Sequence, residues 1–367
     1  MKESIEIPSQ VTPKVLSFYL PQFYPIPLND EWHGKGFTEW TRVTASKPKY
    51  SGHDQPRVPH ADIGHYRLDN PEILRKQASL MERGGVYGQI FYHYWFGGTQ
   101  ILEKPAQILL ENPDIPMNFC FCWANESWSR KWDGGAGEVI LDQDYSLSDA
   151  ENFIKYLIPF FRDTRYVKVA GRPVLFVYRT SDIPGLGFIV ETWNAICSAA
   201  GLLPPYLITI QTGDTFDAAN SGFSAEAERP IYHMQELENL PRFQSIELNN
   251  IKGHVIEYED VVNLYTNYTR RGHLPVIPGL VVSWDPSPRH GTNTLILKGR
   301  SPELYREWLI DALRYSSSRF AQEEAFVVIN AWNEWAEGAY LEPDNSHGYE
   351  FLDVTREAQE IFTWDVK

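Results

Sequence analysis

Cysteine, positive charge and long apolar segments are all scarce in this chain of 367 residues. Three cysteines cannot form a paired disulfide framework, and Cys120 and Cys122 lack the spacing of a zinc knuckle, so a reducing compartment is expected. No segment approaches the ~20 apolar residues that span a membrane, and the first residues lack the apolar stretch of a secretory signal. We therefore expect a cytoplasmic protein without a membrane span, or a periplasmic or extracellular one if the chain is trimmed or part of a longer protein.

The balance of charge excludes one class of partner. Lysine and arginine total 33 residues against 48 acidic ones, which gives a net charge of −15. Phosphate backbones are bound by clustered positive charge, and this sequence has no basic stripe. Nucleic acid is therefore not expected as a partner.

Aromatic residues are abundant, with 12 Trp, 20 Tyr and 19 Phe, and this content excludes a disordered chain. Short apolar segments alternate with helical patterns, which is typical of parallel strands covered by helices. The expected strands lie at 15–20, 89–95, 117–123, 174–178, 206–210, 276–282 and 326–331, with an eighth near 216–219 or 231–234.

The helices between these strands carry their own start signals. These are Asn70-Pro71 before a helix over 72–83, a capping box at Ser148 and Glu151, and Ser301-Pro302 before a helix toward 315. No strand leads into a Gly-x-Gly-x-x-Gly phosphate loop, which favours a closed barrel over an open doubly wound sheet. We predict an α/β fold: one (β/α)8 barrel over 15–367 with elaborated loops at the C-terminal face of the strands, preceded by an N-terminal extension over 1–14.

Aromatic and polar side chains follow strand after strand. In a (β/α)8 barrel the carboxyl ends of the strands converge on one mouth, where active sites lie. Aromatic faces can pack on sugar rings, while amides and carboxylates can hydrogen-bond to hydroxyl groups. The candidate carbohydrate-binding residues are Tyr19, Gln22, Glu39, Trp40, Tyr92, His93, Tyr94, Trp95, Trp123, Asn125, Glu126, Trp128, Trp284, Asp285, Trp332, Asn333 and Trp335.

Glu334 and Glu337 are the candidate catalytic residues. They follow the apolar strand at 326–331, three residues apart, in a segment rich in tryptophan. Hydrolysis of a glycosidic bond needs two carboxyl groups, one to protonate the leaving oxygen and one to act as nucleophile or base. Neighbouring indoles would raise a carboxyl pKa by desolvation. The alternative is that both glutamates lie on the surface at a helix start, where the helix dipole favours them.

Two other clusters are open to a structural reading. Asn125 and Glu126 either bind hydroxyl groups between flanking tryptophans, or the tryptophans belong to the core and Glu126 pairs with Arg130. Within 92–95 the alternation of a strand lets at most two of the four side chains reach the barrel mouth. His93 is then either a substrate-orienting group or a buried core histidine.

Other chemistries are weakly represented. The ten histidines show no ligand spacing, so neither a metal nor a cofactor is expected. No Gly-x-Ser-x-Gly elbow supports acyl transfer. Asp142-Gln143-Asp144 matches the Asp-x-Asp pattern that could hold a divalent cation and a nucleotide diphosphate, although three-residue matches are common by chance.

Several of these motifs, in register, resemble the WbsX-like family, which is related to glycoside hydrolase family 99. The matching segments are 18–23, 36–40, 92–96, 122–126 and 330–338. The resemblance implies a (β/α)8 barrel and a retaining mechanism with paired glutamates in an Asn-Glu-Trp-x-Glu-Gly context. On this resemblance Glu334 removes the proton from a sugar 2-hydroxyl, so that O2 attacks C1 and a 1,2-anhydro sugar forms, while Glu337 acts as acid and then base.

The sequence therefore predicts a retaining glycoside hydrolase that acts on a bacterial polysaccharide or glycan. WbsX-like proteins carry a glycosyltransferase label because many are encoded with polysaccharide biosynthesis. A glycosyltransferase or transglycosylase in O-antigen or capsule synthesis is accordingly the first alternative. A non-catalytic carbohydrate-binding protein that uses the same aromatic residues is the second. Carbohydrate is the expected partner in all three.

Overall fold

The computed structural model describes residues 11–129, 139–213, 221–232, 237–240, 242–248, 251–289 and 294–364. Its centre is a curved sheet of parallel strands that share one apolar core. In sheet order these strands are β13 (Val276–Ile277), β10 (Ala225–Ala227), β9 (Tyr206–Ile210), β8 (Arg172–Val177), β4 (Asn118–Trp123), β2 (Gly88–Phe96), β1 (Lys14–Tyr19), β16 (Phe326–Asn330) and β14 (Gly279–Val281).

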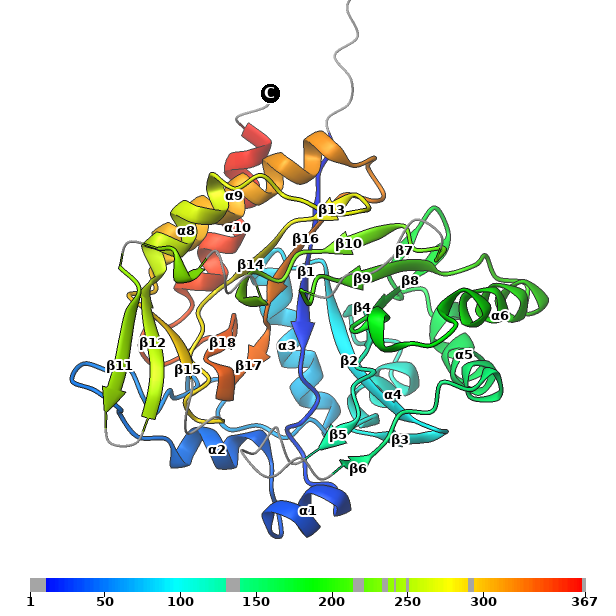
Figure 1. The fold of residues 1–367 in the computed structure, drawn as a ribbon, viewed down its shortest axis with the longest axis horizontal. Helices are drawn as coiled ribbons and strands as arrows, with labels where there is room; N and C mark the ends of the chain where they lie inside the picture. The colour runs from blue at the N-terminus through cyan, green and yellow to red at the C-terminus, as the bar shows by residue number, and fades with distance from the viewer. Residues whose placement is uncertain are drawn as a thin grey trace, which may run out of the picture.

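The sheet closes on itself at Pro278. This proline separates β13 from β14, because it has no N–H to give to a ladder. Its carbonyl still accepts from the Val328 amide at 3.0 Å. Since β13 pairs with β10 and β14 pairs with β16, one extended segment joins the two ends of the sheet. Within the described residues the strands thus occupy eight positions, and the predicted (β/α)8 barrel is confirmed (Figure 1).

Helices alternate with the strands and cover the barrel. Helices α5 and α6 lie together on one flank, and α8, α9 and α10 lie together on the other (Figure 1). The helices of the described chain are α1 (Pro27–His33), α2 (Glu39–Ala45), α3 (Pro71–Gly84), α4 (Lys104–Glu111), α5 (Leu147–Arg162), α6 (Leu186–Ala199), α8 (Tyr258–Thr266), α9 (Pro302–Arg319) and α10 (Glu350–Trp364).

Two of the three predicted helix starts are confirmed, and the third needs a correction. Asn70 and Ser301 accept hydrogen bonds from the backbone amides of Glu72 and Leu304, as N-caps do. In α5 the cap is Ser146 rather than Ser148, since the Ser146 hydroxyl accepts from the Asp149 amide at 3.2 Å. Two serines at alternate positions offered two possible caps, and the helix begins at the earlier one.

The eighth strand is β10, and the predicted position at 231–234 is wrong where the structure describes it. Residues 231–232 belong to the 3₁₀ helix η4 (Pro230–Tyr232), while 216–219 and 233–234 lie outside the described residues. Strand β10 consists of Ala-Glu-Ala, which carries no β-branched residue to signal a strand. Its neighbours hold it in place instead, because it pairs with β9 on one side and with β13 on the other.

Short elements elaborate the connections between strands. They are the two-stranded pairs β5 (Trp128–Ser129) with β6 (Val139–Leu141) and β17 (Asn333–Glu334) with β18 (Ala339–Tyr340), the three-stranded sheet of β11 (Gln244–Leu248), β12 (Ile251–Glu257) and β15 (Thr294–Lys298), strands β3 (Thr99–Ile101) and β7 (Lys168–Val169), and the 3₁₀ helices η2 (Thr180–Asp182) and η5 (Trp335–Glu337). Within the described part of the chain, none of the helices combines the length and apolar character needed to cross a membrane.

Closure of the barrel gives a first prediction. A methyl group added at Gly279 would lie 2.1 Å from the Glu228 carbonyl oxygen, which is backbone and cannot turn away. We expect Gly279→Ala to lower the free energy of unfolding by about 1–3 kcal/mol through overpacking, as measured by urea denaturation. The control is Gly187→Ala in α6, where nothing lies within 4 Å of the added methyl. Its stability should be unchanged or higher by up to about 1 kcal/mol. Equal stability of the two variants would contradict this account of closure.

Candidate active site

The hairpin that follows β16 presents the two glutamates. Glu334 ends β17 and Glu337 ends η5, and they are only 3% and 6% exposed. The Asn333 side chain fixes this hairpin to the end of β1, because its Oδ1 accepts from the Leu20 amide at 2.7 Å and its Nδ2 donates to the Leu20 carbonyl at 3.0 Å. The alternative of two exposed residues at a helix start does not hold.

A buried carboxylate, Glu342, supports the hairpin from below. The indole nitrogens of Trp332 and Trp335 donate to it at 3.0 and 2.8 Å, and the Tyr66 hydroxyl and the Gln77 amide donate at 2.8 and 2.7 Å. Burial raises the pKa of Glu342 to about 7, against the effect of these four donors. The two tryptophans therefore point their polar atoms away from the glutamate pair.

Glu334 and Glu337 line an open cavity at the carboxyl ends of the strands. This is the end of a (β/α)8 barrel where active sites lie. The wall combines carboxylates, arginines and aromatic rings. The lining residues are Leu20, Gln22, Asn29, His33, Glu39, Arg42, Tyr92, Tyr94, Ala124, Glu126, Trp128, Ile140, Tyr178, Arg229, Arg289, Glu334 and Glu337.

One guanidinium joins three of the carboxylates that line the cavity. Arg289 forms direct ion pairs with Glu39 and Glu337, and its Nη2 lies 3.3 Å from Oε2 of Glu334. Burial and the neighbouring charge of Glu337 raise the pKa of Glu334, while Arg289 and Arg229 act in the opposite direction. Glu334 therefore keeps its proton at pH values where an ordinary glutamate is ionised.

Several predicted side chains meet in this cavity. Besides the two glutamates, they are Gln22, Glu39, Tyr92, Tyr94, Glu126 and Trp128. The alternation of β2 explains why two of its four predicted residues are absent. Tyr92 and Tyr94 face inward, whereas His93 lies against the rings of Phe121 and Tyr156, and burial lowers its pKa to about 3. His93 is a core histidine.

The other predicted residues do not line the cavity. They are Tyr19, Trp40, His93, Trp95, Trp123, Asn125, Trp284, Asp285, Trp332, Asn333 and Trp335. Most bond or pack within the protein, because a buried indole or phenol needs a partner for its polar atom. Trp95 donates to the Asp149 carboxylate at 2.9 Å, and Trp40 donates to the Tyr66 carbonyl at 2.8 Å. These residues lie near the ends of strands, close to the barrel mouth, but their side chains do not point into the cavity.

Within the second predicted cluster, Asn125 is structural and Glu126 faces the cavity. Asn125 donates to the Arg179 carbonyl and accepts from the Arg179 amide, both at 2.8 Å. Glu126 pairs with the same Arg179, whose Nε lies 2.5 Å from Oε1. Its suggested partner, Arg130, lies outside the described residues. Trp123 packs on the ring of Phe153, with ring centroids 4.8 Å apart.

The Asp142-Gln143-Asp144 motif uses its oxygens locally. Asp142 accepts from the Ser127 hydroxyl at 2.5 Å, and Asp144 accepts from the Ser146 amide at 2.8 Å. Across the residues that the structure describes, no group of three or more His, Cys, Asp or Glu side chains could hold a metal ion.

Sequence reasoning missed several cavity residues. Tyr178 ends a predicted strand, so its aromatic ring carried the same signal as the residues that were selected. Arg229 follows β10, and it was missed together with that strand. Arg289 lies in an irregular segment after β14, and no local pattern marks it.

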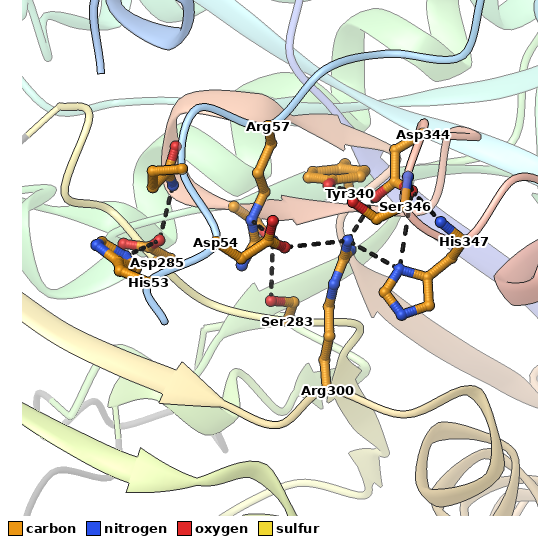
Figure 2. A network of polar contacts seen from close by, with 12 residues as sticks. His53, Asp54, Arg57, Ser283, Asp285, Arg300, Tyr340, Asp344, Ser346 and His347 are labelled. Carbon is orange, nitrogen blue, oxygen red and sulfur yellow. Dashed lines mark hydrogen bonds and ion pairs between the residues drawn. The ribbon is translucent and has the colours of Figure 1, made fainter. Parts of the chain in front are cut away.

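Asp285 joins the hairpin that carries Glu337 to residues His53 and Gln55. Its Oδ2 accepts from His53 Nε2 at 2.7 Å (Figure 2). The same oxygen accepts from Gln55 Nε2 at 2.7 Å, and the Asp285 backbone amide donates to the Glu337 carbonyl at 2.6 Å. Because the Lys49 amide donates to His53 Nδ1, His53 Nε2 carries the hydrogen that Asp285 accepts. Burial opposes ionisation of Asp285, but the bonds from His53 and Gln55 and the charge of Arg57 lower its pKa to about 2.

Residues 53–57 form a strap across the same hairpin. Arg57 donates to the Gly338 carbonyl at 2.8 Å and to the Ser283 hydroxyl at 3.0 Å. Beyond it, Arg300 pairs with Asp344, which also accepts from the Tyr340 hydroxyl at 2.6 Å (Figure 2). The Glu337 carbonyl is thus bound by the Asp285 amide, and the following Gly338 carbonyl is bound by the Arg57 side chain.

The sequence model of one protein family, described as Glycosyltransferase WbsX, matches residues 15–355 of this chain. The chain belongs to the WbsX family. Two curated relatives are both named uncharacterized protein WxcX, from two strains of Xanthomonas campestris pv. campestris. The chain is 37% identical over 355 residues to that of strain ATCC 33913, covering 97% of this chain and 51% of the relative. For strain B100 the identity is 37% over 352 residues, covering 96% and 50%. The WbsX chain thus spans about half the length of the curated relatives it matches.

Solved structures with the same fold carry glycoside hydrolase names. One described as a glycoside hydrolase-like protein has a TM-score of 0.64 at 14% identity, covering 98% of this chain and 96% of its own. The GH99 endo-α-mannosidase of Bacteroides thetaiotaomicron, in complex with bis-tris propane, has a TM-score of 0.59 at 14% identity, covering 95% and 97%. At this identity the likeness concerns the fold. The predicted family and its relation to the fold of glycoside hydrolase family 99 are confirmed.

The lowered pKa of Asp285 predicts acid sensitivity. As pH falls, the unfolded chain takes up this proton first, so the stability contributed above the ordinary pKa of 3.8 is lost as pH falls toward 2. We expect the unfolding free energies of wild type and Asp285→Asn to differ by about 2 kcal/mol more at pH 6 than at pH 2. Urea denaturation across this range measures the difference.

The matched control for this prediction is Asp54→Asn. Asp54 lies on the same strap, but its side chain is 51% exposed and 3.8 Å from Arg57. Exposed pairs contribute little, so its effect should stay below about 1 kcal/mol at every pH. An Asp285→Asn difference that is constant with pH would show that the Asp285 carboxylate is not held ionised.

Proposed function

We propose that this WbsX-family protein is a retaining glycoside hydrolase that cleaves a bacterial polysaccharide or glycan, with Glu334 and Glu337 as its catalytic residues. The observation that carries the proposal is the pair itself: two nearly buried carboxylates line one open cavity and share one guanidinium. Glycoside hydrolysis needs two such groups in different protonation states.

The proposed reaction has two steps. Glu334 removes the proton of the sugar 2-hydroxyl while O2 attacks C1, and the C1–oxygen bond to the leaving group breaks as Glu337 donates its proton to that oxygen. Glu337 then takes a proton from water, which attacks C1 and opens the 1,2-anhydro ring, and O2 regains the proton held by Glu334. Two displacements at C1 retain the anomeric configuration. The 2-hydroxyl must lie trans to the leaving group, as in α-linked sugars of the manno configuration.

The raised pKa of Glu334 bears on which of the two glutamates is the acid and which is the base. Burial and the charge of Glu337 favour the protonated form of Glu334, whereas the family resemblance makes Glu337 the acid. The proposed roles therefore require that the proton be on Glu337 when the bond breaks. Exchange of the two roles is the alternative, and leaving-group dependence distinguishes them.

The residues that line the cavity support the proposal of a carbohydrate ligand. Its wall carries the rings of Tyr92, Tyr94, Trp128 and Tyr178 beside charged groups. Aromatic faces suit the C–H faces of sugars, and carboxylates and guanidinium groups hydrogen-bond to hydroxyls. The names of the fold relatives, a glycoside hydrolase-like protein and an endo-α-mannosidase, agree with this class of ligand.

Transglycosylation in surface polysaccharide synthesis is the second candidate, and the family description as a glycosyltransferase favours it. Glu334 and Glu337 would catalyse transglycosylation in the same two steps, with a sugar hydroxyl in place of water in the second step. Addition of an acceptor oligosaccharide would then give a longer product with the same anomeric linkage. A transferase that uses a nucleotide sugar would instead bind that donor, which calorimetry detects.

The test uses wild type, Glu337→Gln and Glu334→Gln on α-linked bacterial polysaccharides of the manno configuration and on the matching glycosyl fluoride. Glu337→Gln should lose about 10²–10⁴-fold on the polysaccharide. It should lose far less in the first step on the fluoride, which leaves without protonation. Glu334→Gln should fail on both. Mass spectrometry follows the products, and NMR identifies the anomer first formed.

The matched control is Glu151→Gln, because Glu151 is exposed on α5 and pairs only with Lys155 in the hydrogen bonds described for it. Its activity should equal that of wild type. Wild-type activity of Glu337→Gln on the polysaccharide would exclude the assignment, and an inverted anomer would exclude a retaining mechanism. If only Glu334→Gln is restored by the fluoride, the two roles are exchanged.

A further inference from the structure

Three carboxylates from separate elements converge on Arg289. Glu39 opens α2, Glu334 ends β17 and Glu337 ends η5. The Arg289 side chain is 13% exposed, and those of its partners are 2–8% exposed. Buried charges interact strongly because solvent screens them little, so this cation interacts strongly with the carboxylates around it.

We propose that Arg289 is a positioning residue for the reaction: its guanidinium, held by Glu39 between the two reacting glutamates, keeps one of them ionised while the other carries the proton. The catalytic meaning of this inference rests on the function proposed above. A two-carboxylate mechanism needs one base and one acid, and it stops if both groups are ionised or both are protonated. Arg289 supplies the positive charge that prevents both glutamates from being protonated at once.

The backbone holds Arg289 in a defined place. Asp285 Oδ1 accepts from the Ser287 amide at 3.2 Å, and the Arg289 amide donates to the Pro286 carbonyl at 2.9 Å, so residues 285–289 form a turn. The other oxygen of Asp285 is bound by the strap through His53 (Figure 2). The amide of Asp285 also bonds to the Glu337 carbonyl. One turn therefore positions both the cation and the glutamate that it contacts.

Other charged and titratable groups face the pair. From β2, from the residues after β10, from the 285–289 turn and from α2, these are Tyr92, Tyr94, Arg229, Arg289 and Glu39. The effects of Glu39 and Arg289 on Glu334 are opposite in sign. The negative charge of Glu39 raises the pKa of Glu334, whereas the positive charge of Arg289 lowers it.

This opposition gives a test that needs no substrate. If Arg289 acts through its charge, Arg289→Met should move the titration of Glu334 upward by about 1–3 pH units. Glu39→Gln should move it downward, because a negative charge is removed while Arg289 remains. Loss of a merely structural contact would loosen the site in both variants and would not produce shifts of opposite sign.

The measurement is ¹³C NMR of full-length protein labelled at glutamate Cδ, titrated in the absence of ligand. The signal of Glu334 is assigned by its loss in Glu334→Gln. Arg289→Lys serves if Arg289→Met does not fold, since one ammonium cannot contact both carboxylates as the guanidinium does and should give a smaller upward shift. Arg75→Met is the matched control, because Arg75 forms exposed pairs with Glu72 and Asp114 on α3.

Opposite shifts in the Arg289 and Glu39 variants, with none in Arg75→Met, would support the inference. No shift in the Arg289 variants, or shifts of the same sign in the Arg289 and Glu39 variants, would overturn it. Failure of the proposed function is distinguishable, because it would show as absence of cleavage while the titration shifts remain. Where cleavage is found, the acid limb of the kcat profile should move up in Arg289→Met and down in Glu39→Gln.

Discussion

Burial of several carboxylates around one cavity is the constraint on which the rest of this structure depends. An ionised carboxylate that leaves water without a partner costs several kcal/mol, so each such group must be paired, hydrogen-bonded or protonated. All three solutions occur here. Arg289 pairs with Glu39 and Glu337, donors surround Glu342, and burial raises the pKa of Glu334, which favours its protonated form.

The need to satisfy buried carboxylates also explains why some residues around the hairpin support it while others line the cavity. In the sequence, the tryptophans beside the glutamates suggest a surface that stacks on sugar rings. In the structure, Trp332 and Trp335 donate their indole N–H groups to Glu342. They make a rigid support whose indole faces pack in the core, as shown by the stacking of Trp335 on Tyr340 with ring centroids 3.8 Å apart. The cavity wall is left to tyrosines from other strands and to charged groups. The proposed function requires both a rigid support for the glutamate pair and charged groups beside it.

The barrel itself is common to proteins whose sequences differ widely. The fold relatives share 14% identity with this WbsX-family chain, so the scaffold carries little information about substrate. The hairpin after β16, the turn at 285–289 and the strap at 53–57 are far apart in sequence and are joined by hydrogen bonds beside Glu337. The Asp285 amide binds the Glu337 carbonyl and Arg57 binds the Gly338 carbonyl, and these hydrogen bonds fix the backbone at Glu337.

The sequence by itself determined the barrel, the segment that carries the glutamate pair and the family. Buried parallel strands are continuous apolar runs, helix caps are local, and the hairpin motif is contiguous, so each could be recognised within a short window. The tertiary structure alone decided strand β10, which its neighbours hold without any propensity of its own, and the direction of each side chain at the mouth. It also decided the partners of Asp285 and Arg289, because these contacts join residues about 50 to 250 positions apart and no local pattern specifies them.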